Sequence, residues 1–129
     1  MGKCSEKGIM AGAAFVSIDA PASASPGQVV SIPIILTNTY HLRALIAPAG
    51  QFNSSPVSIA PHSVWLSQNE QAHFVATFTM PSQNVKLALT ACSSYDGATW
   101  DIDETKEFSI KAVVVEPEVS GLEASFASF

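Results

Sequence analysis

Charged residues are scarce in this sequence, making up 13% of its 129 positions. A typical soluble protein carries about 25%, so Ser, Thr, Asn, Gln and Ala must cover much of the surface. Such a surface favours contact with other protein, or an extracellular setting, over a free cytosolic enzyme. The low charge therefore predicts a structural or interaction role.

Basic residues are few and scattered along the chain. Six Lys and Arg residues stand against eleven Asp and Glu residues, which gives a formal net charge of -5. Nucleic-acid binding requires clustered basic side chains that displace counterions from phosphates. Because no stretch forms such a cluster, the sequence predicts no nucleic-acid partner.

Cysteines and long apolar runs are also scarce. We expect the two cysteines, Cys4 and Cys92, to be free thiols, because Cys4 lies in a polar segment that would rarely meet the narrow geometry of a disulfide. No apolar run is long enough to span a membrane. Residues 8–18 have a weak signal-peptide shape, but Phe15 to Ile18 are more typical of a first strand.

Recognisable catalytic and cofactor motifs are missing. There is no Gly-x-Ser-x-Gly elbow and no phosphate-binding glycine pattern. The three histidines have no ligand partner at zinc spacing. Asp101 and Asp103 could hold calcium together with turn carbonyls, but they lack an EF-hand ligand array, and a solvated hairpin is the preferred interpretation. We expect no enzymatic activity, no metal, no cofactor and no small-molecule substrate.

The sequence does contain short strand-like runs separated by turn clusters. Apolar and polar residues alternate most regularly from Val85 to Ala91, and similar runs cover Val29 to Thr37 and Ala72 to Thr79. Pro33 cannot donate to a ladder, so we expect an edge or a bulge there. No segment has a convincing helical period. Seven or eight strands without helices predict an all-β, immunoglobulin-like sandwich of two sheets.

Two boundaries are predicted from turn residues. Pro48 to Gly50 should close a strand that begins at Leu42. Trp100 to Glu104 and Phe108 to Val115 are predicted as separate strands.

Five segments resemble immunoglobulin-like domains of prokaryotic and archaeal-virus proteins, including adhesion-type domains found in repeats. They are Ser25 to Asn38, Trp65 to Glu70, Phe78 to Pro81, Val85 to Ala91 and Tyr95 to Trp100. The resemblance implies the sandwich fold, and it brings no catalytic residues. In such proteins a similar domain often follows.

The predicted organisation has three parts: an N-terminal extension (residues 1–12), the sandwich (13–115), and a linker with an extra C-terminal strand (116–129). In the last part Leu122, Ala124 and Phe126 alternate as in a strand, and Phe129 follows. We expect this strand to pair with its own sheet or with a neighbouring subunit.

The leading hypothesis is a structural subunit of a virion or another extracellular assembly, for example a capsid, decoration or surface protein. Its partners would be itself or other structural subunits, joined through Leu122, Ala124, Phe126 and Phe129 by strand addition. The alternative is an extracellular or cell-surface adhesion module. Its ligand would bind loops that carry the aromatic and imidazole side chains Tyr40, His41, Tyr95 and Trp100.

Overall fold

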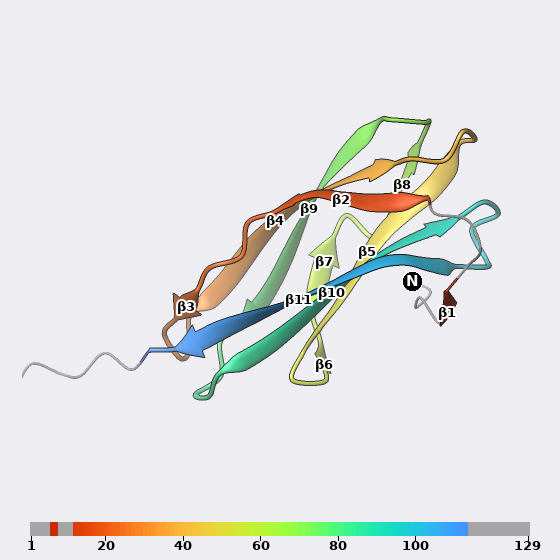
Figure 1. Cartoon of the computed structure of the whole chain (residues 1–129). Helices are drawn as coiled ribbons and strands as arrows, with labels where there is room; N and C mark the ends of the chain where they lie inside the picture. Colours follow the sequence, from red (N-terminus) through yellow and green to blue (C-terminus); the bar gives the residue numbers. More distant parts are fainter. Residues whose placement is uncertain (1–5, 8–11, 114–129) are drawn as a thin grey trace, which may run out of the picture.

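Strands joined by turns and short loops make up the described part of the chain. The structure is a computed structural model that describes residues 6–7 and 12–113, and no helix occurs among them. Eleven strand segments form two sheets packed face to face (Figure 1). The all-β sandwich predicted from the sequence is therefore confirmed.

One sheet has four strands in the order β2-β4-β9-β7. The strands are β2 (Ala13–Ile18), β4 (Val29–Asn38), β9 (Gln71–Thr79) and β7 (Ser58–Ala60). All three pairings are antiparallel. Apolar side chains alternate along β4 and β9, so each strand turns one face inward.

The other sheet has seven strands and the main order β1-β11-β10-β5-β6. Its long members are β5 (Ala44–Phe52), β10 (Val85–Ser94) and β11 (Asp101–Ala112). Four short segments complete it: β1 (Glu6–Lys7), β3 (Ser23–Ala24), β6 (Ser55–Pro56) and β8 (Val64–Leu66). β8 pairs with β5, whereas β1 and β3 pair with β11 in parallel.

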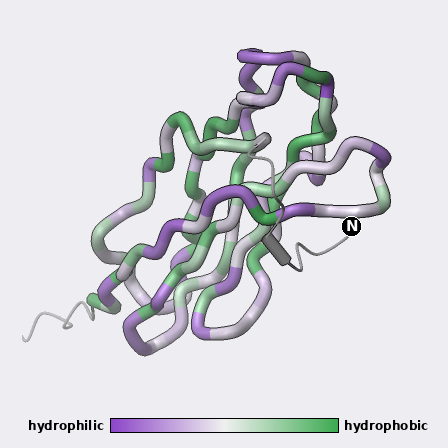
Figure 2. Tube along the Cα trace, turned by 45° about the vertical axis from the view of Figure 1, so that its right-hand side comes forward, coloured by the Kyte–Doolittle hydropathy of each residue, from purple (hydrophilic) through white to green (hydrophobic). Residues whose placement is uncertain are grey.

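The core lies between the two sheets. Phe74 of β9 is 1% exposed, and Ile32, Leu36, Leu87 and Leu89 are completely buried. Burying such a side chain stabilises the folded state by about 1.5–3 kcal/mol. The alternation of apolar and polar residues along each strand places these side chains in the core. Figure 2 shows apolar and polar residues interspersed along the strands, as this pattern requires.

Pro33 lies where one neighbour of β4 ends. The β2–β4 pairing stops at Ile18 and Ile34, and the Asp19 N–H then donates to the Pro33 carbonyl at 3.0 Å. The N and C=O of one strand residue point to the same side. The missing donor of Pro33 therefore faces the β2 side, just beyond the last paired residues. β4 lies between β2 and β9 and is not an edge strand of the sheet, so Pro33 is accommodated because the β2 pairing ends beside it.

Two of the predicted boundaries are wrong. Pro48 to Gly50 lie inside β5 and pair with β10 from Ala91 to Leu89. The proline is tolerated because β8 pairs only with residues 44–46 of β5, and β6 only with residues 51–52. The two strands predicted at the C-terminal side are one continuous strand, β11, because its pairing with β10 passes through Thr105 to Glu107 without a turn.

The expectation of free thiols is also wrong for Cys92. This residue is completely buried on β10 and is disulfide-bonded. Cys4, the other cysteine of the chain, lies outside the described residues.

Candidate functional site

The outer edge of β11 is occupied only at its two ends. Glu6 and Lys7 of β1 pair with Asp101 and Ile102, and β3 pairs with Lys111 and Ala112. Among the described residues, no strand pairs with this edge between positions 103 and 110. An exposed strand edge carries unpaired N–H and C=O groups and is a template for another strand.

The direction of these backbone groups follows from the pairing with β3. The N–H groups of Lys111 and Val113 donate to Ala22 and Ala24, so they point away from β10. Because successive N–H groups alternate in direction along a strand, those of Ser109, Glu107 and Thr105 also point outward.

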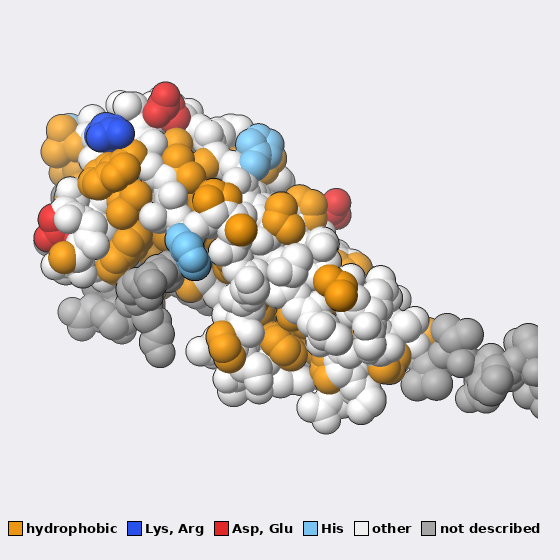
Figure 3. All heavy atoms as spheres, turned by 180° about the vertical axis from the view of Figure 1, so that it is seen from behind, with side chains coloured by type: hydrophobic (Ala, Val, Ile, Leu, Met, Phe, Trp, Pro, Cys, Tyr) orange, Lys and Arg blue, Asp and Glu red, His pale blue; other side chains and the backbone are white. Residues whose placement is uncertain are grey.

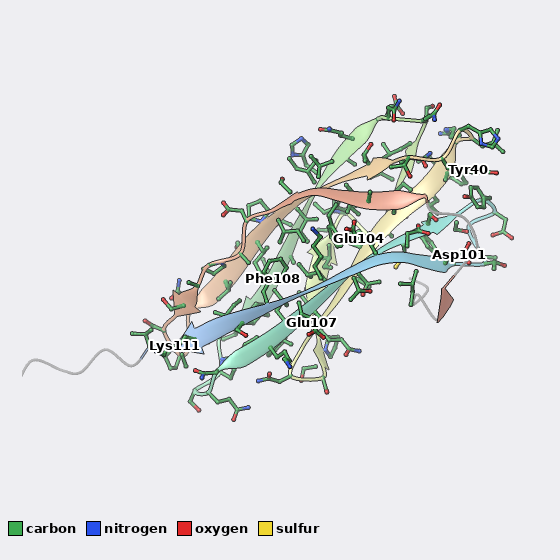
Figure 4. All side chains as sticks on the ribbon, in the orientation of Figure 1. Tyr40, Asp101, Glu104, Glu107, Phe108 and Lys111 are labelled. Carbon is green, nitrogen blue, oxygen red and sulfur yellow. The ribbon has the colours of Figure 1, made fainter. Side chains whose placement is uncertain are left out.

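Two acidic side chains of β11 bind the edge of the opposite sheet. Asp103 Oδ2 accepts a hydrogen bond from the Ala13 N–H at 2.8 Å, and Glu104 Oε1 accepts one from the Phe15 N–H at 2.9 Å. Figure 4 shows β11 running beside β2, with Glu104 on the side toward that strand. We call Asp103 and Glu104 the carboxylate clasp, because they close the outer edge of β2.

The clasp lies in a crowded part of the sandwich. A side chain at Gly12 would place its Cβ 2.7 Å from Ser93 Oγ, so only glycine fits there. Burial raises the pKa of the Asp103 carboxyl, and the hydrogen bond from the Ala13 N–H partly offsets this effect. Lys106 Nζ lies 3.9 Å from Glu104 Oε2, and both side chains of this ion pair are partly exposed.

Apolar side chains flank the clasp. Phe15 and Ile18 of β2 and Phe108 of β11 are partly buried and pack against the core. Figure 4 places Phe108 on the same side of β11 as Glu104. The side of the sandwich between β2 and β11 therefore combines an open backbone edge with incompletely covered apolar surface.

A second group of residues gathers at one end of the sandwich. The Tyr40 ring lies 4.2 Å from the His41 ring and 5.2 Å from the Tyr95 ring, measured between centroids. His41 is exposed, whereas Tyr40 and Tyr95 are half-buried. Burial raises the pKa of the Tyr95 hydroxyl, and Tyr40 adds to this effect.

Two polar side chains hold these loops. The completely buried Asn38 donates to the carbonyls of Leu42 and Leu66, and its Oδ1 accepts the Tyr40 N–H at 2.9 Å. In the other loop Asp96 Oδ1 accepts from the N–H groups of Ala98 and Thr99, both at 2.8 Å. These bonds lower the pKa of Asp96 to about 2.

Trp100 is separated from the other predicted loop residues. It is only 8% exposed and packs with Ala47 and Cys92 in a small cluster apart from the main core. The structure thus brings Tyr40, His41 and Tyr95 together, whereas Trp100 packs in the interior. The binding role of these four residues stays a prediction.

The predicted assembly residues Leu122, Ala124, Phe126 and Phe129 lie outside the described residues. The clasp was not predicted from the sequence, in which the acidic residues of this region indicated a solvated hairpin. The sequence shows only that two carboxylates lie within a predicted strand. It does not show that one of them binds a backbone N–H 90 residues away.

The described residues contain no group of three or more His, Cys, Asp or Glu arranged to hold a metal ion. They also contain no helix that is long and apolar enough to cross a membrane.

Comparison with known proteins gives structural similarity only. No protein-family model matches the chain, and no curated protein sequence matches it. A PapD-like domain of human CEP192 is similar with a TM-score of 0.59 and 12% identity, covering 90% of this chain and 95% of the other. The CARDB domain of the Pyrococcus furiosus protein PF1109, solved with di-metal ions, has a TM-score of 0.60 and 10% identity, covering 84% and 100%.

A third similar structure is native alpha-2-macroglobulin from Escherichia coli, with a TM-score of 0.59 and 17% identity. The match covers 83% of this chain and 17% of that one. At these identities the comparisons establish the architecture alone. The chain has the fold of immunoglobulin-like β-sandwich domains.

Proposed function

We propose that this protein is a non-enzymatic, immunoglobulin-like subunit of a virion or another extracellular assembly. In this proposal, residues 119–129 of one subunit add as a strand to the β11 edge of another. The observation that carries the proposal is the edge of β11 from position 103 to 110, which no strand among the described residues occupies and which short parallel strands bound at both ends.

The size of this edge suits the predicted strand. Eight residues of extended chain span about 26 Å, and the segment from Val119 to Phe129 has eleven residues. The N–H groups of Thr105, Glu107 and Ser109 would donate to the incoming strand. Strand addition takes its affinity from such backbone bonds and its specificity from alternate side chains.

The apolar side of the edge supports the same proposal. Leu122, Ala124 and Phe126 alternate, so in a strand they share one face. That face would cover Phe108 and Phe15, which the subunit itself leaves partly exposed. Phe129 would extend the contact by a further aromatic ring.

Attachment within the same subunit is disfavoured by β3. A strand that turned back directly after β11 would first meet Lys111 and Ala112, whose outer edge already pairs with Ser23 and Ala24. Pairing with another subunit avoids this conflict. The charge-poor composition supports the extracellular or virion setting, since such a surface suits protein contact.

The test is the solution mass of the purified full-length chain, measured by light scattering across concentrations. Glu107→Pro removes one outward N–H and keeps the ladder with β10, whereas Glu107→Ala removes the same charge and keeps the N–H. We expect particles larger than dimers for wild type and Glu107→Ala, and loss of these particles in Glu107→Pro and after deletion of Glu118 to Phe129.

The contrast between the variants decides the mechanism. Assembly that survives the deletion would reject the C-terminal strand as the donor. Assembly that is kept in Glu107→Pro but lost in the deletion would mean that the C-terminal strand pairs with a surface other than the β11 edge. Circular dichroism of each variant shows whether the sandwich is retained.

A second candidate function is ligand or adhesion binding at the loop end, which the close, tilted packing of the Tyr40 ring with the His41 and Tyr95 rings favours. Two aromatic faces and an imidazole could hold a glycan or a protein side chain. Binding to a glycan array that is lost in His41→Ala and kept in Glu107→Ala would support this function. An array without hits would count against glycan recognition.

A further inference from the structure

A pocket of about 430 Å³ lies at the end of β11 that adjoins β3 (Figure 1). We call it the basic pocket, and its lining includes Ala22, Asn53, Asn84, Lys86, Ser109 and Lys111. We propose that the basic pocket binds the acidic segment Glu116 to Glu118 of another copy, so that the added strand runs antiparallel to β11. This inference rests on the proposed strand exchange and specifies its direction and its charged contact.

Two lysines make the pocket positive. Lys86 lies directly opposite Ser109 in the pairing of β10 with β11, and Lys111 is two residues further along β11. The two lysines therefore share one face of the sheet, about 7 Å apart on the diagonal. Among the described residues, no acidic side chain lines the pocket, and the only ion pair joins Lys106 to Glu104. Both lysines of the pocket are thus available to carboxylates.

Positive charge is sparse on the rest of the molecule. The chain has six Lys and Arg residues against eleven Asp and Glu residues, and two of the six line this pocket. Seen from behind, basic side chains are few (Figure 3). The nearest acidic residue of β11, Glu107, lies opposite Ala88 and does not line the pocket. An acidic segment therefore finds few other favourable places on a chain of this net charge.

Two asparagine side chains hold the walls of the pocket. Asn53 Oδ1 accepts the Lys86 N–H at 2.9 Å, and Asn84 Oδ1 accepts the Ala112 N–H at 2.9 Å. Asn53 Nδ2 also donates to the Asn84 carbonyl at 3.1 Å. The backbone on both sides of the pocket is therefore fixed before a ligand arrives, which lowers the ordering cost of binding.

The charges along β11 favour one direction of the added strand. The strand begins with acidic residues, among them Asp101 and Asp103, and has Lys111 near its end. Figure 4 places Asp101 and Lys111 at opposite ends of the ribbon. A parallel strand would bring Glu118 beside the acidic start, whereas an antiparallel strand brings it beside the basic pocket. Opposite charges on neighbouring strands stabilise a sheet and like charges destabilise it, so the antiparallel arrangement is preferred.

β3 directs the acidic segment onto the outer face. It occupies the β11 edge at Lys111 and Ala112, so an antiparallel strand has to leave this edge near position 110. The inner side of the sheet is filled by the core at this point, since Ile110 is completely buried. The open path leads over the outer face, where Lys86 and Lys111 line the pocket.

The acidic segment matches the spacing of the two lysines. Glu116 and Glu118 are separated by Pro117, which restricts the residue before it to extended backbone. Two residues of extended chain span about 7 Å, similar to the expected distance between Lys86 and Lys111. Each carboxylate can therefore meet one ammonium group.

The test is the dissociation constant of the full-length assembly, measured by sedimentation at low salt. Lys86→Gln with Lys111→Gln, and Glu116→Gln with Glu118→Gln, should each weaken assembly by about fivefold, and less at high salt. Lys106→Gln is the control, because it removes a positive charge from β11 outside the pocket. The glutamate variant lowers the net negative charge, so general repulsion between copies would change in the opposite direction. Lys111→Glu combined with Glu118→Lys should restore assembly.

A carbodiimide crosslink, which joins a lysine amine to a carboxylate as an amide, checks the contact directly. In a mixture of isotope-labelled and unlabelled chains, we expect links between copies from Glu116 or Glu118 to Lys86 or Lys111. Links to Lys7, which lies at the other end of the β11 edge, would show a parallel strand and overturn the inference.

The outcomes separate this inference from strand exchange. If the lysine and glutamate variants assemble as well as Lys106→Gln, while deletion of Glu118 to Phe129 abolishes assembly, only the pocket contact fails and strand exchange stands. If wild type is monomeric or assembly survives the deletion, strand exchange fails and the pocket contact fails with it. Circular dichroism of each variant shows whether the sandwich is retained.

Discussion

Asp103 of β11 accepts a hydrogen bond from the backbone N–H of Ala13 at 2.8 Å, across 90 residues of sequence. The two residues belong to different sheets, so this bond ties the open side of the sandwich together. It also occupies an outward donor of β2, an edge strand of the four-stranded sheet. The fold thus closes one of its edges with side chains and leaves the neighbouring edge of β11 available.

The first prediction concerns this bond. Asp103→Ala should lower the free energy of unfolding by about 1–3 kcal/mol, because the Ala13 N–H would lose its partner in a crowded region. Asp103→Asn should cost less, since its amide oxygen can still accept. Urea unfolding at neutral pH measures both changes, with the exposed Glu107→Ala as control. An alanine variant as stable as wild type would contradict the structural role of the bond.

The second prediction concerns the pH dependence that Asp103 produces. Its pKa is raised in the folded state, so the folded state holds this proton more tightly than the unfolded state. The resulting contribution to stability is fully present below the unfolded pKa and is lost as the pH rises through the folded pKa. Asp103→Asn lacks this pH-dependent contribution, and its stability relative to wild type should therefore rise between acidic and neutral pH. A constant difference would show that the pKa is not raised.

The third prediction concerns Asp96, whose folded pKa of about 2 lies below its ordinary value of 3.8. Its contribution to stability is present above the unfolded pKa and is lost as the pH falls through the folded pKa. An NMR titration of the Asp96 carboxyl should give a midpoint near 2. Asp96→Asn should keep the loop conformation, since its amide oxygen still accepts from the N–H groups of Ala98 and Thr99. Its stability should not show the loss at acidic pH that Asp96 causes.

The fourth prediction concerns Asn38, which is completely buried and makes three side-chain hydrogen bonds. Asn38→Ala should lower the free energy of unfolding by about 3 kcal/mol, because the carbonyls of Leu42 and Leu66 would lose buried donors. It should also increase hydrogen exchange in the loop that carries Tyr40. Gln68→Ala, at an exposed position of the neighbouring turn, is the comparison. Equal effects of the two substitutions would refute the anchoring role of Asn38.

The fifth prediction concerns the Tyr95 hydroxyl, which is buried and has no hydrogen-bond partner among the described residues. A buried polar group without a partner costs free energy. Tyr95→Phe should therefore leave stability unchanged or raise it by up to about 1 kcal/mol. A clear loss of stability in thermal unfolding would mean that the hydroxyl does have a partner.

Strand positions were predictable wherever side chains alternate. Val85, Leu87, Leu89 and Ala91 are buried as their spacing predicts, because a strand turns successive side chains to opposite faces. Turn residues were less reliable guides. Pro48 is tolerated within β5 because the two short strands on one side of β5, β8 and β6, do not pair with it there. Sequence alone does not show where a neighbouring strand ends.

The sequence by itself determined the class of the fold, the apolar core and the low charge of the surface, because these depend on composition and on local spacing. Only the tertiary structure decided that Asp103 meets Ala13, that Tyr40 meets Tyr95, and that Trp100 is buried beside Cys92. Each of these contacts joins residues from different strands or loops. Their distances depend on sheet order and register, which local spacing does not specify.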